Sequence, residues 1–209
     1  MVPRTEMTQA IRMSGQQRDL FRPASPLPAG LVYQPDFLSV AEEASLLATI
    51  ETLPLTEARY KSFTAKRRIL TFGGTYDFDA GELLPAPPMP EFLLPLRERV
   101  AAWTAVPATD FTHGLVTEYR PGTALGWHRD VPNFAVVAGV SLGAPTRTRF
   151  RPYPLRKNRR EDTFALLLEP RSIYLFRDEA RWRWQHSIPA TKALRYSITF
   201  RTLARRRGA

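Results

Sequence analysis

The sequence predicts a mainly β protein with flanking helices, built around a double-stranded β-helix, or jelly roll. From Phe111 onward, short β-rich runs alternate with turns, and two helical segments precede them. Several short strands at regular spacing are typical of a β-sandwich or barrel, and a double-sheet jelly roll fits their number. The mouth of such a fold is a common place for a small-molecule site. The predicted strands are 111–119, 134–142, 147–152, 163–168, 172–177, 181–188 and 194–203.

One domain is expected over residues 29–204, which are numerous enough to bury a sizeable core. Residues 1–28 lack hydrophobic periodicity and contain several prolines, so we expect a flexible leader there. Residues 205–209 include three consecutive arginines and are expected to form a basic tail. No feature of the chain implies an obligate protein partner.

The first helix is expected to begin after Ser39 and to end near Thr52. Ser39 and Glu42 have the spacing of a capping box, in which each side chain accepts a hydrogen bond from the other's backbone. Pro95 lies inside the second predicted helix, 91–104, which is therefore expected to be kinked or to be two short helices. Between the helices we expect a strand at 68–72 and a Pro-rich loop at 75–90.

The chain is strongly basic, with 30 Lys and Arg against 20 Asp and Glu, a net charge of +10 and a pI near 10.5. Such an excess favours a polyanionic partner, with nucleic acid first. The alternative is a basic protein with no such partner. The segment 147–160 contains seven Arg or Lys residues and no acidic residue, so it is a candidate phosphate-binding edge.

Composition also bears on the compartment. The chain has no cysteine, which excludes disulfides and thiolate metal sites and fits a reducing cytoplasm. No run of about 18 apolar residues is present, so no membrane span is expected. The first residues contain no apolar segment of the kind found in secretory signals, so we expect a cytoplasmic protein.

Three residues are candidate metal ligands: His128, Asp130 and His186. Residues i and i+2 of a strand project to the same face, so His128 and Asp130 are expected to reach one point, and His186 from a distant strand would complete a set of three. Two histidines and one carboxylate are the ligands of non-haem Fe(II) oxygenases. Taken singly, each is more often a structural residue; their combination favours a metal. His113 lacks a paired carboxylate, so we expect a structural or substrate-proximal role.

The run 194–203 carries two arginines on one face. Alternation places Arg195, Ser197, Thr199 and Arg201 on that face, and apolar residues on the other. A solvated outer face is the ordinary explanation for this pattern. The alternative is a pocket wall that clamps an anion, because the planar guanidinium matches a carboxylate in a bidentate way. Tyr119 is a candidate to offer its phenol to the same ligand.

At these residues the sequence resembles the AlkB family of Fe(II)/2-oxoglutarate dioxygenases. The resemblance covers about residues 30–203 and implies a jelly-roll core. It rests on the order His-x-Asp, then His, then two arginines six residues apart. The segments that carry it are Glu118-Tyr119-Arg120-Pro121-Gly122, Gly126-Trp127-His128-Arg129-Asp130, Val140-Ser141-Leu142-Gly143, His186 and Arg195-Tyr196-Ser197-Ile198-Thr199-Phe200-Arg201.

The resemblance also implies roles for individual residues. His128, Asp130 and His186 would be the iron ligands. Arg195, assisted by Tyr119, would bind the distal carboxylate of 2-oxoglutarate. Arg201 would lie near the 1-carboxylate and Asp130. Thr117 and Ser197 stand where the family often has asparagine, so contacts with the cosubstrate there would have a shorter reach.

The expected reaction is oxidative dealkylation of N-alkylated bases in DNA, such as methyl or etheno lesions. It would use Fe(II), 2-oxoglutarate and O2 and release an aldehyde, succinate and CO2. The alternatives are an RNA- or tRNA-modifying enzyme, a protein or small-molecule hydroxylase, and a non-catalytic nucleic-acid-binding jelly roll. The resemblance further places a nucleotide-recognition lid at about 59–80. Phe72, Tyr76 and Phe78 would cover the base there, unless they are simple hydrophobic cover, and 60–68 is a second candidate for phosphate contacts.

Overall fold

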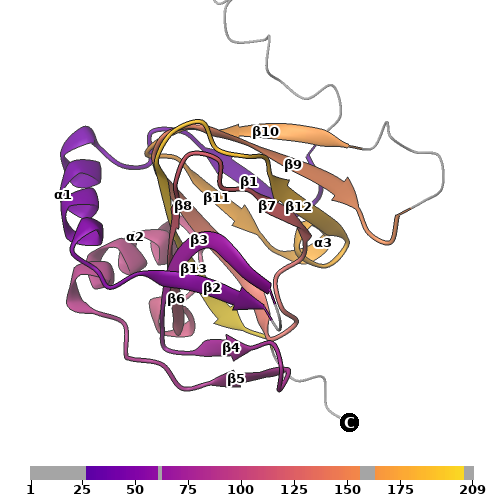
Figure 1. Ribbon diagram of the computed structural model, residues 1–209, viewed down its shortest axis with the longest axis horizontal. Helices are drawn as coiled ribbons and strands as arrows, with labels where there is room; N and C mark the ends of the chain where they lie inside the picture. The colour runs from indigo at the N-terminus through magenta and orange to yellow at the C-terminus, as the bar shows by residue number, and fades with distance from the viewer. Residues whose placement is uncertain (1–26, 61–62, 156–162, 205–209) are drawn as a thin grey trace, which may run out of the picture.

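Two antiparallel sheets form the body of the protein, and a computed structural model describes residues 27–60, 63–155 and 163–204 of it (Figure 1). The larger sheet has the strand order β1-β11-β8-β13-β6-β3-β2, and the smaller has the order β10-β9-β12-β7. The larger sheet comprises β1 (Leu31–Gln34), β11 (Ile173–Phe176), β8 (Phe134–Gly143), β13 (Arg195–Leu203), β6 (His113–Tyr119), β3 (Phe63–Phe72) and β2 (Thr56–Tyr60). The smaller sheet comprises β10 (Phe164–Leu168), β9 (Thr146–Pro152), β12 (Trp184–Ile188) and β7 (Leu125–His128). The prediction of a mainly β jelly roll is confirmed.

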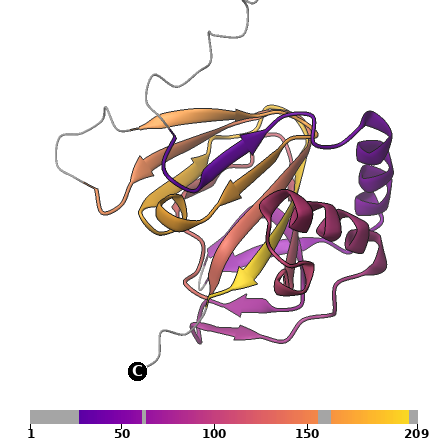
Figure 2. The same ribbon diagram turned by 180° about the vertical axis from the view of Figure 1, so that it is seen from behind.

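Both long helices cover one face of the larger sheet, on the side away from the smaller sheet (Figures 1 and 2). They are α1 (Val40–Glu51) and α2 (Leu94–Thr104). The apolar face of β13 supplies Tyr196, Ile198 and Phe200 to the core beneath them. Because side chains alternate along a strand, the opposite face of β13 is turned toward the smaller sheet. The helices therefore anchor the sheet from behind and leave its other face for a site.

The capping box before α1 is confirmed. The Ser39 side chain accepts a hydrogen bond from the Glu42 backbone, and Glu42 accepts one from the Ser39 backbone at 2.7 Å. One residue on, Glu43 is buried and accepts a 2.9 Å hydrogen bond from the backbone N–H of Gly143, at the end of β8. The carboxylate of Glu43 thus ties α1 to the larger sheet.

Several boundaries differ from those predicted. The segment 75–90 is not a plain loop, because it holds a small two-stranded sheet, β4 (Thr75–Asp77) and β5 (Glu82–Leu84). The run 181–188 divides into a short helix, α3 (Asp178–Trp182), and β12. The helix containing Pro95 begins with a 3-10 turn, η2 (Glu91–Leu93), which leaves Pro95 in the first turn of α2, where a missing N–H costs little. A second 3-10 turn, η3 (Ala108–Asp110), precedes β6.

The remaining predicted strands lie within two residues of observed ones, apart from 68–72, which is the second half of the longer β3. The strands β1 and β2 were not among those predicted. Most of the predicted leader and all of the basic tail lie outside the described residues. Within the described ranges, no helix has the length and apolar character needed to cross a membrane.

Candidate active site

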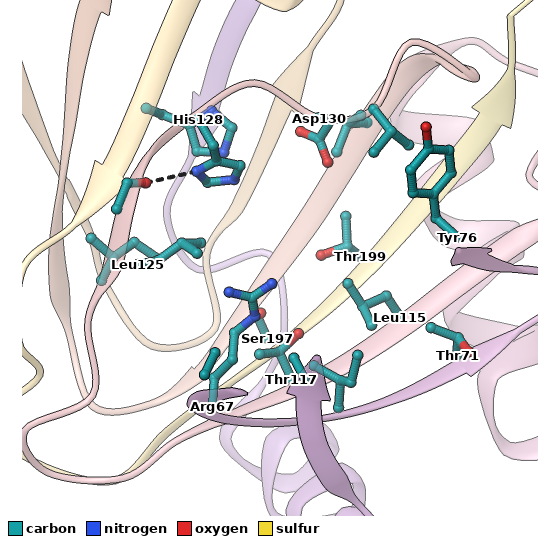
Figure 3. A pocket seen from close by; sticks show the side chains of 18 of the residues that line it. Arg67, Thr71, Tyr76, Leu115, Thr117, Leu125, His128, Asp130, Ser197 and Thr199 are labelled. Atoms are coloured by element: carbon teal, nitrogen blue, oxygen red, sulfur yellow. Dashed lines mark hydrogen bonds between the residues drawn. The ribbon is translucent and has the colours of Figure 1, made fainter. Parts of the chain in front are cut away.

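A cavity of about 1060 Å³ lies between the two sheets. The larger sheet forms its floor, with side chains from β3, β6 and β13, and β7 and β12 of the smaller sheet form the opposite wall. Figure 3 shows Thr117, Ser197 and Thr199 rising from the floor, while His128 and Asp130 lie across the cavity from them. The cavity is therefore lined by strands on both sides, and its floor is the face that the helices leave uncovered.

Strand register fixes the polar row of the floor. Arg195 pairs with Tyr119, Ser197 with Thr117, and Arg201 with His113 across β13 and β6. Ser197, Thr199 and Arg201 line the cavity, as alternation requires. Arg195 is 1% exposed and Arg201 is 9% exposed. A solvated outer face is therefore excluded for this row, and the alternative of a pocket wall is the one that the structure supports.

Arg195 is a buried guanidinium that lacks enough partners. Its Cζ lies 5.0 Å from the centroid of the Tyr119 ring, and its Nε and Nη1 are buried without a hydrogen bond. Burying a charged donor without an acceptor costs several kcal/mol, so such a group is normally paired. Tyr119 and Tyr174 both line the cavity; burial raises the pKa of Tyr174, and the charge of Arg195 acts against this. This end of the floor fits a small carboxylate, because a planar carboxylate satisfies a guanidinium fork.

His128 and His186 lie side by side in the wall of the cavity that faces the floor. They are paired in register between β7 and β12, and their ring centroids are 4.2 Å apart. The Nδ1 atom of His128 lies 2.9 Å from the carbonyl oxygen of Gly126, the only hydrogen bond drawn in Figure 3. Because a carbonyl can only accept, Nδ1 carries the proton and donates a hydrogen bond to it, which leaves the Nε2 lone pair for a metal.

Asp130 is held by Arg201. Arg201 donates to the Asp130 carboxylate from Nη2 at 3.2 Å and from Nε at 3.3 Å. Burial alone would raise the pKa of Asp130, but the positive charge of Arg201, with a smaller contribution from Arg181, lowers it well below its ordinary value. Asp130 lies two residues beyond the end of β7, so the prediction that a strand carries both His128 and Asp130 is wrong. The ion pair with Arg201 orients this carboxylate instead.

The two histidines are neutral in this environment. Burial lowers the pKa of His186 to about 3, with repulsion from His128 as the next cause, and burial is also the main reason that the pKa of His128 is lowered. Neutral imidazoles and an ionised carboxylate are the forms that bind a divalent metal. Among the residues that the structure describes, no three His, Cys, Asp or Glu side chains already converge as a finished metal site. The chemistry of the donors, rather than a preformed cluster, fits a metal.

Arg67 and Tyr174 are among the cavity residues that the sequence did not identify. Arg67 points from β3 into the cavity beside Ser197 in Figure 3, and burial lowers its pKa. It was missed because the predicted strand began at residue 68 and so excluded Arg67, whereas β3 begins at Phe63. Tyr174 of β11 is paired with Gly139 of β8, and its ring covers the glycine so closely that a Cβ added to Gly139 would come within 2.2 Å of it. A glycine inside a strand signals such a close approach, and Gly139 was the available clue.

The predicted lid aromatics divide into two groups. Tyr76 and Phe78 line the cavity and pack edge to face, with ring centroids 4.9 Å apart. Phe72 instead belongs to the core beneath the helices, because its side chain is on the face of β3 opposite Thr71. The structure therefore contradicts the prediction that Phe72 covers a base. His113 lies in the floor, where burial lowers its pKa to about 3.

The basic segment begins as a strand. On β9, Arg147, Arg149 and Arg151 alternate with buried residues, so they share the outer face of the smaller sheet. Trp127 packs between two of them, 5.3 Å from the Cζ of Arg149 and 4.3 Å from that of Arg151. Residues 156–162, the rest of the basic segment, lie outside the described ranges. In the described part of the segment, the candidate phosphate-binding residues are therefore a row of arginines on a strand.

A jelly roll that brings two histidines, a carboxylate and buried arginines to one cavity has the features of a non-haem Fe(II) oxygenase that uses a keto acid. The comparison with family models agrees with this class. The model described as the 2OG-Fe(II) oxygenase superfamily matches residues 30–201. The chain belongs to this superfamily, and its relatives support its membership of the AlkB family.

Two relatives illustrate that membership. The Arabidopsis thaliana protein named Alkylated DNA repair protein ALKBH8 homolog is 31% identical over 186 residues, which are 78% of this chain and 51% of that protein. The Danio rerio protein named Probable RNA/DNA demethylase ALKBH6 is 29% identical over 169 residues, 77% of this chain and 70% of that protein. The chain thus spans about half the length of the first of these relatives.

Solved structures agree on the fold. The structure of OsALKBH1 superposes with a TM-score of 0.64 and 16% identity, covering 85% of this chain and 100% of the other. A Pseudomonas putida prolyl-4-hydroxylase superposes with a TM-score of 0.58 and 14% identity, covering 84% and 93%. At these identities the likeness concerns the fold and leaves the substrate open.

Proposed function

We propose that the protein is an Fe(II)/2-oxoglutarate-dependent dioxygenase that removes alkyl groups from base nitrogens in DNA, as in the repair of methyl or etheno lesions. The observation that carries the proposal is Arg195, a buried guanidinium with two nitrogens that lack partners. Its Cζ lies 5.0 Å from the ring of Tyr119, and Tyr119 lines the same cavity as His128 and His186. An anion on Arg195 and a metal on the histidines would then share one cavity, as a keto-acid cosubstrate requires.

The cosubstrate and the metal have separate sets of candidate residues. Arg195 and Tyr119 would bind one carboxylate of 2-oxoglutarate, and Thr117 and Ser197, paired in register, would offer hydroxyls beside it. Arg201 would serve the other carboxylate while it holds Asp130.

His128, Asp130 and His186 would bind Fe(II), Asp130 being oriented by Arg201 and His128 by the Gly126 carbonyl. When bound, Fe(II), 2-oxoglutarate and O2 supply the oxidation of the alkyl carbon, with succinate and CO2 as co-products. The protein's own part is to orient these groups and to exclude water from the floor.

Three features support a nucleic acid as the substrate. The net charge is +10, the relatives' names refer to alkylated DNA repair and to RNA/DNA demethylation, and Tyr76 and Phe78 line the cavity. A base inside a duplex cannot reach such a cavity, so the target would be flipped out or single-stranded. Of the expected lid 59–80, the part that follows β3 would act as the lid, with Tyr76 and Phe78 covering the base. The absence of cysteine fits a reducing compartment, and the cytoplasm is the expected location.

The test is mass spectrometry of succinate and released aldehyde, with methylated and etheno-bridged DNA and RNA oligomers as substrates. We expect aldehyde from alkylated DNA, and no aldehyde from the Asp130→Ala variant. Aldehyde released from alkylated RNA but not from alkylated DNA would show that the substrate is RNA and not DNA. Succinate formation that no alkylated oligomer stimulates would refute the nucleic-acid substrate and favour another hydroxylase reaction.

A further inference from the structure

A smaller cavity of about 420 Å³ opens beside the main cavity, at the end where Asp130 lies. This volume is within the range of small-molecule sites. The two cavities are contiguous, since Tyr76, Phe78, Arg129, Asp130 and Val131 line both of them. We call the smaller one the side cavity; its remaining wall consists of Pro132, Tyr153, Arg181, Trp182 and Gln185.

Two exposed aromatic side chains flank an arginine in the side cavity. Tyr153 and Trp182 are each 41% exposed, and no other aromatic appears among the exposed large hydrophobic residues of the described chain. Between them, the Cζ of Arg129 lies 3.9 Å from the centroid of the Tyr153 ring, and its Nη1 donates a 2.9 Å hydrogen bond to the Trp182 carbonyl. Exposed aromatic faces beside a cation are the elements that bind single-stranded nucleic acid, by stacking and by phosphate contact.

The side cavity also contains a buried, incompletely paired arginine. Arg181 is 3% exposed, donates from Nη2 to the Val131 carbonyl at 2.6 Å, and has no partner for Nε. Its Cζ lies 4.4 Å from the Trp182 ring centroid. Of the described residues that line the side cavity, Asp130 alone is acidic, and Arg201 already holds it at 3.2 Å. The charge of this cavity therefore favours an anionic ligand.

We infer that the side cavity binds the nucleotide adjacent to the target base, with its nucleobase stacked on Tyr153 or Trp182 and its phosphate against Arg129. The inference rests on the proposed function and deepens it. A strand whose target base enters the main cavity past Asp130 would bring its next nucleotide to this contiguous space. The protein would then recognise at least two successive nucleotides of an unpaired strand.

The surface beyond the side cavity continues the same chemistry. Gln185, which lines it, accepts a 2.8 Å hydrogen bond from the Nε of Arg151. Arg151 belongs to the arginine row of β9, next to Arg149, and Trp127 of β7 packs against both side chains. A strand leaving the side cavity would therefore meet further cations, which suits the phosphodiester backbone better than an uncharged ligand.

The test determines which nucleotide of a single-stranded oligomer binds in the side cavity. Single-stranded oligomers carry one alkylated base and one abasic residue, placed in turn at each flanking position. Their affinity for the protein with Fe(II) and 2-oxoglutarate is measured anaerobically by fluorescence anisotropy, so that no turnover occurs. We expect one adjacent position, on one side only, to weaken binding about tenfold when its base is missing, because a stacked base is lost.

Matched variants then assign that position to the side cavity. In Tyr153→Ala combined with Trp182→Ala, the abasic penalty should fall to about twofold or less, whereas Tyr153→Phe should keep it. Val40→Ala, at an exposed residue on α1, is the control that should also keep it. Arg129→Gln should lower the slope of log affinity against log salt by about 0.7, as expected for one lost phosphate contact on a single strand, and Arg177→Gln should leave it unchanged.

The outcomes separate the two proposals. An abasic penalty that persists in the double variant, or that no flanking position shows, overturns the side-cavity inference even when aldehyde is released from alkylated oligomers. If no alkylated oligomer releases aldehyde but the penalty appears and depends on Tyr153 and Trp182, the side cavity stands and the dealkylation proposal fails. Preferential competition by an acidic peptide over an unmodified oligonucleotide would replace nucleic acid by protein as the ligand.

Discussion

The floor and the lid of the main cavity are built in different ways. The floor residues of β13 belong to a central strand that pairs with β6 on one side and β8 on the other, so their positions are fixed by register on both edges. The lid aromatics Tyr76 and Phe78 come from or follow β4, which pairs only with β5 in the described chain. Figure 1 shows this small sheet apart from the two large ones.

This difference suggests a division of roles, in which the floor and the facing wall determine the reaction and the lid determines the substrate. Residues that must meet with sub-ångström tolerance are supported by paired strands and by the helix-covered core, since such a scaffold fixes side-chain geometry. The lid rests on one short hairpin and can vary without disturbing the floor. Changes in the floor and the facing wall should therefore stop the reaction, and changes in the lid should alter only which substrate is used.

The largest effect is expected at the proposed metal ligands. His128→Ala or Asp130→Ala should lower succinate formation by more than about a hundredfold, the upper end of the loss seen when even an outer partner of a metal ligand is removed. His113→Gln, a histidine in the same cavity, should keep Fe(II) binding and is the matched control. Fe(II) binding is followed by calorimetry and succinate by mass spectrometry; near-normal succinate from either alanine variant would contradict the assignment.

Loss of the buried guanidinium should come next. Arg195→Gln should raise the KM for 2-oxoglutarate about a hundredfold, because a charge-assisted, desolvated pair contributes about 2–4 kcal/mol when one partner is truncated. Arg68→Gln is the control on the opposite face of the floor, where Arg68 pairs with Glu118 at 3.2 Å. It should lower stability and leave this KM unchanged. An unaltered KM in Arg195→Gln would remove 2-oxoglutarate from this end of the cavity.

Packing of the floor can be tested without the reaction. Gly139→Ala should lower the free energy of unfolding by about 2 kcal/mol, since the new Cβ would overlap the Tyr174 ring and force it to move. Gly126→Ala has nothing within 4 Å of its Cβ and should unfold like the wild type. Adding Tyr174→Ala should make Gly139→Ala harmless. Chemical denaturation measures the wild type, the two glycine variants, Tyr174→Ala and the double variant, and equal stability of the two glycine variants would contradict the close approach.

The lid should give the smallest effect. Tyr76→Ala should lower kcat/KM for an alkylated oligomer about tenfold, because one stacking surface for the base is lost. Tyr76→Phe should restore the rate, since it keeps the ring. The KM for 2-oxoglutarate should be the same in all three proteins, which is the point that distinguishes lid from floor. A parallel rise in that KM would show that the two regions are not independent.

The sequence predicted the floor far better than the lid, and the reason is physical. Alternation in 194–203 identified the Arg195 and Arg201 face, because a long strand has one period and two faces. The placement of Phe72 in the lid came from the family resemblance and not from alternation, and the structure places this ring in the core beneath the helices. The hairpin β4–β5 was missed because its strands have only three residues each, too few for a period to be read.

The partners in contacts between distant segments could not be identified from the sequence, even where a residue such as Gly139 signals a close approach. The position of Tyr174 against Gly139 depends on the register between β11 and β8. The side cavity depends on how α3 and the segments after β7 and β9 meet in space. The sequence predicted that His128 and His186 bind one metal, but not that they are a cross-strand pair. That register comes from the structure.

The central claim is that the Arg195 end and the histidine end serve one cosubstrate in one cavity. Anaerobic titration of the protein with Fe(II) and then 2-oxoglutarate, followed by visible absorption, tests it most directly. We expect a weak charge-transfer band that appears only when both are present, that is absent in His128→Ala, and that needs about a hundredfold more 2-oxoglutarate in Arg195→Gln. No band in the wild-type protein, together with no 2-oxoglutarate binding by calorimetry, would contradict the account and leave a nucleic-acid-binding jelly roll in its place.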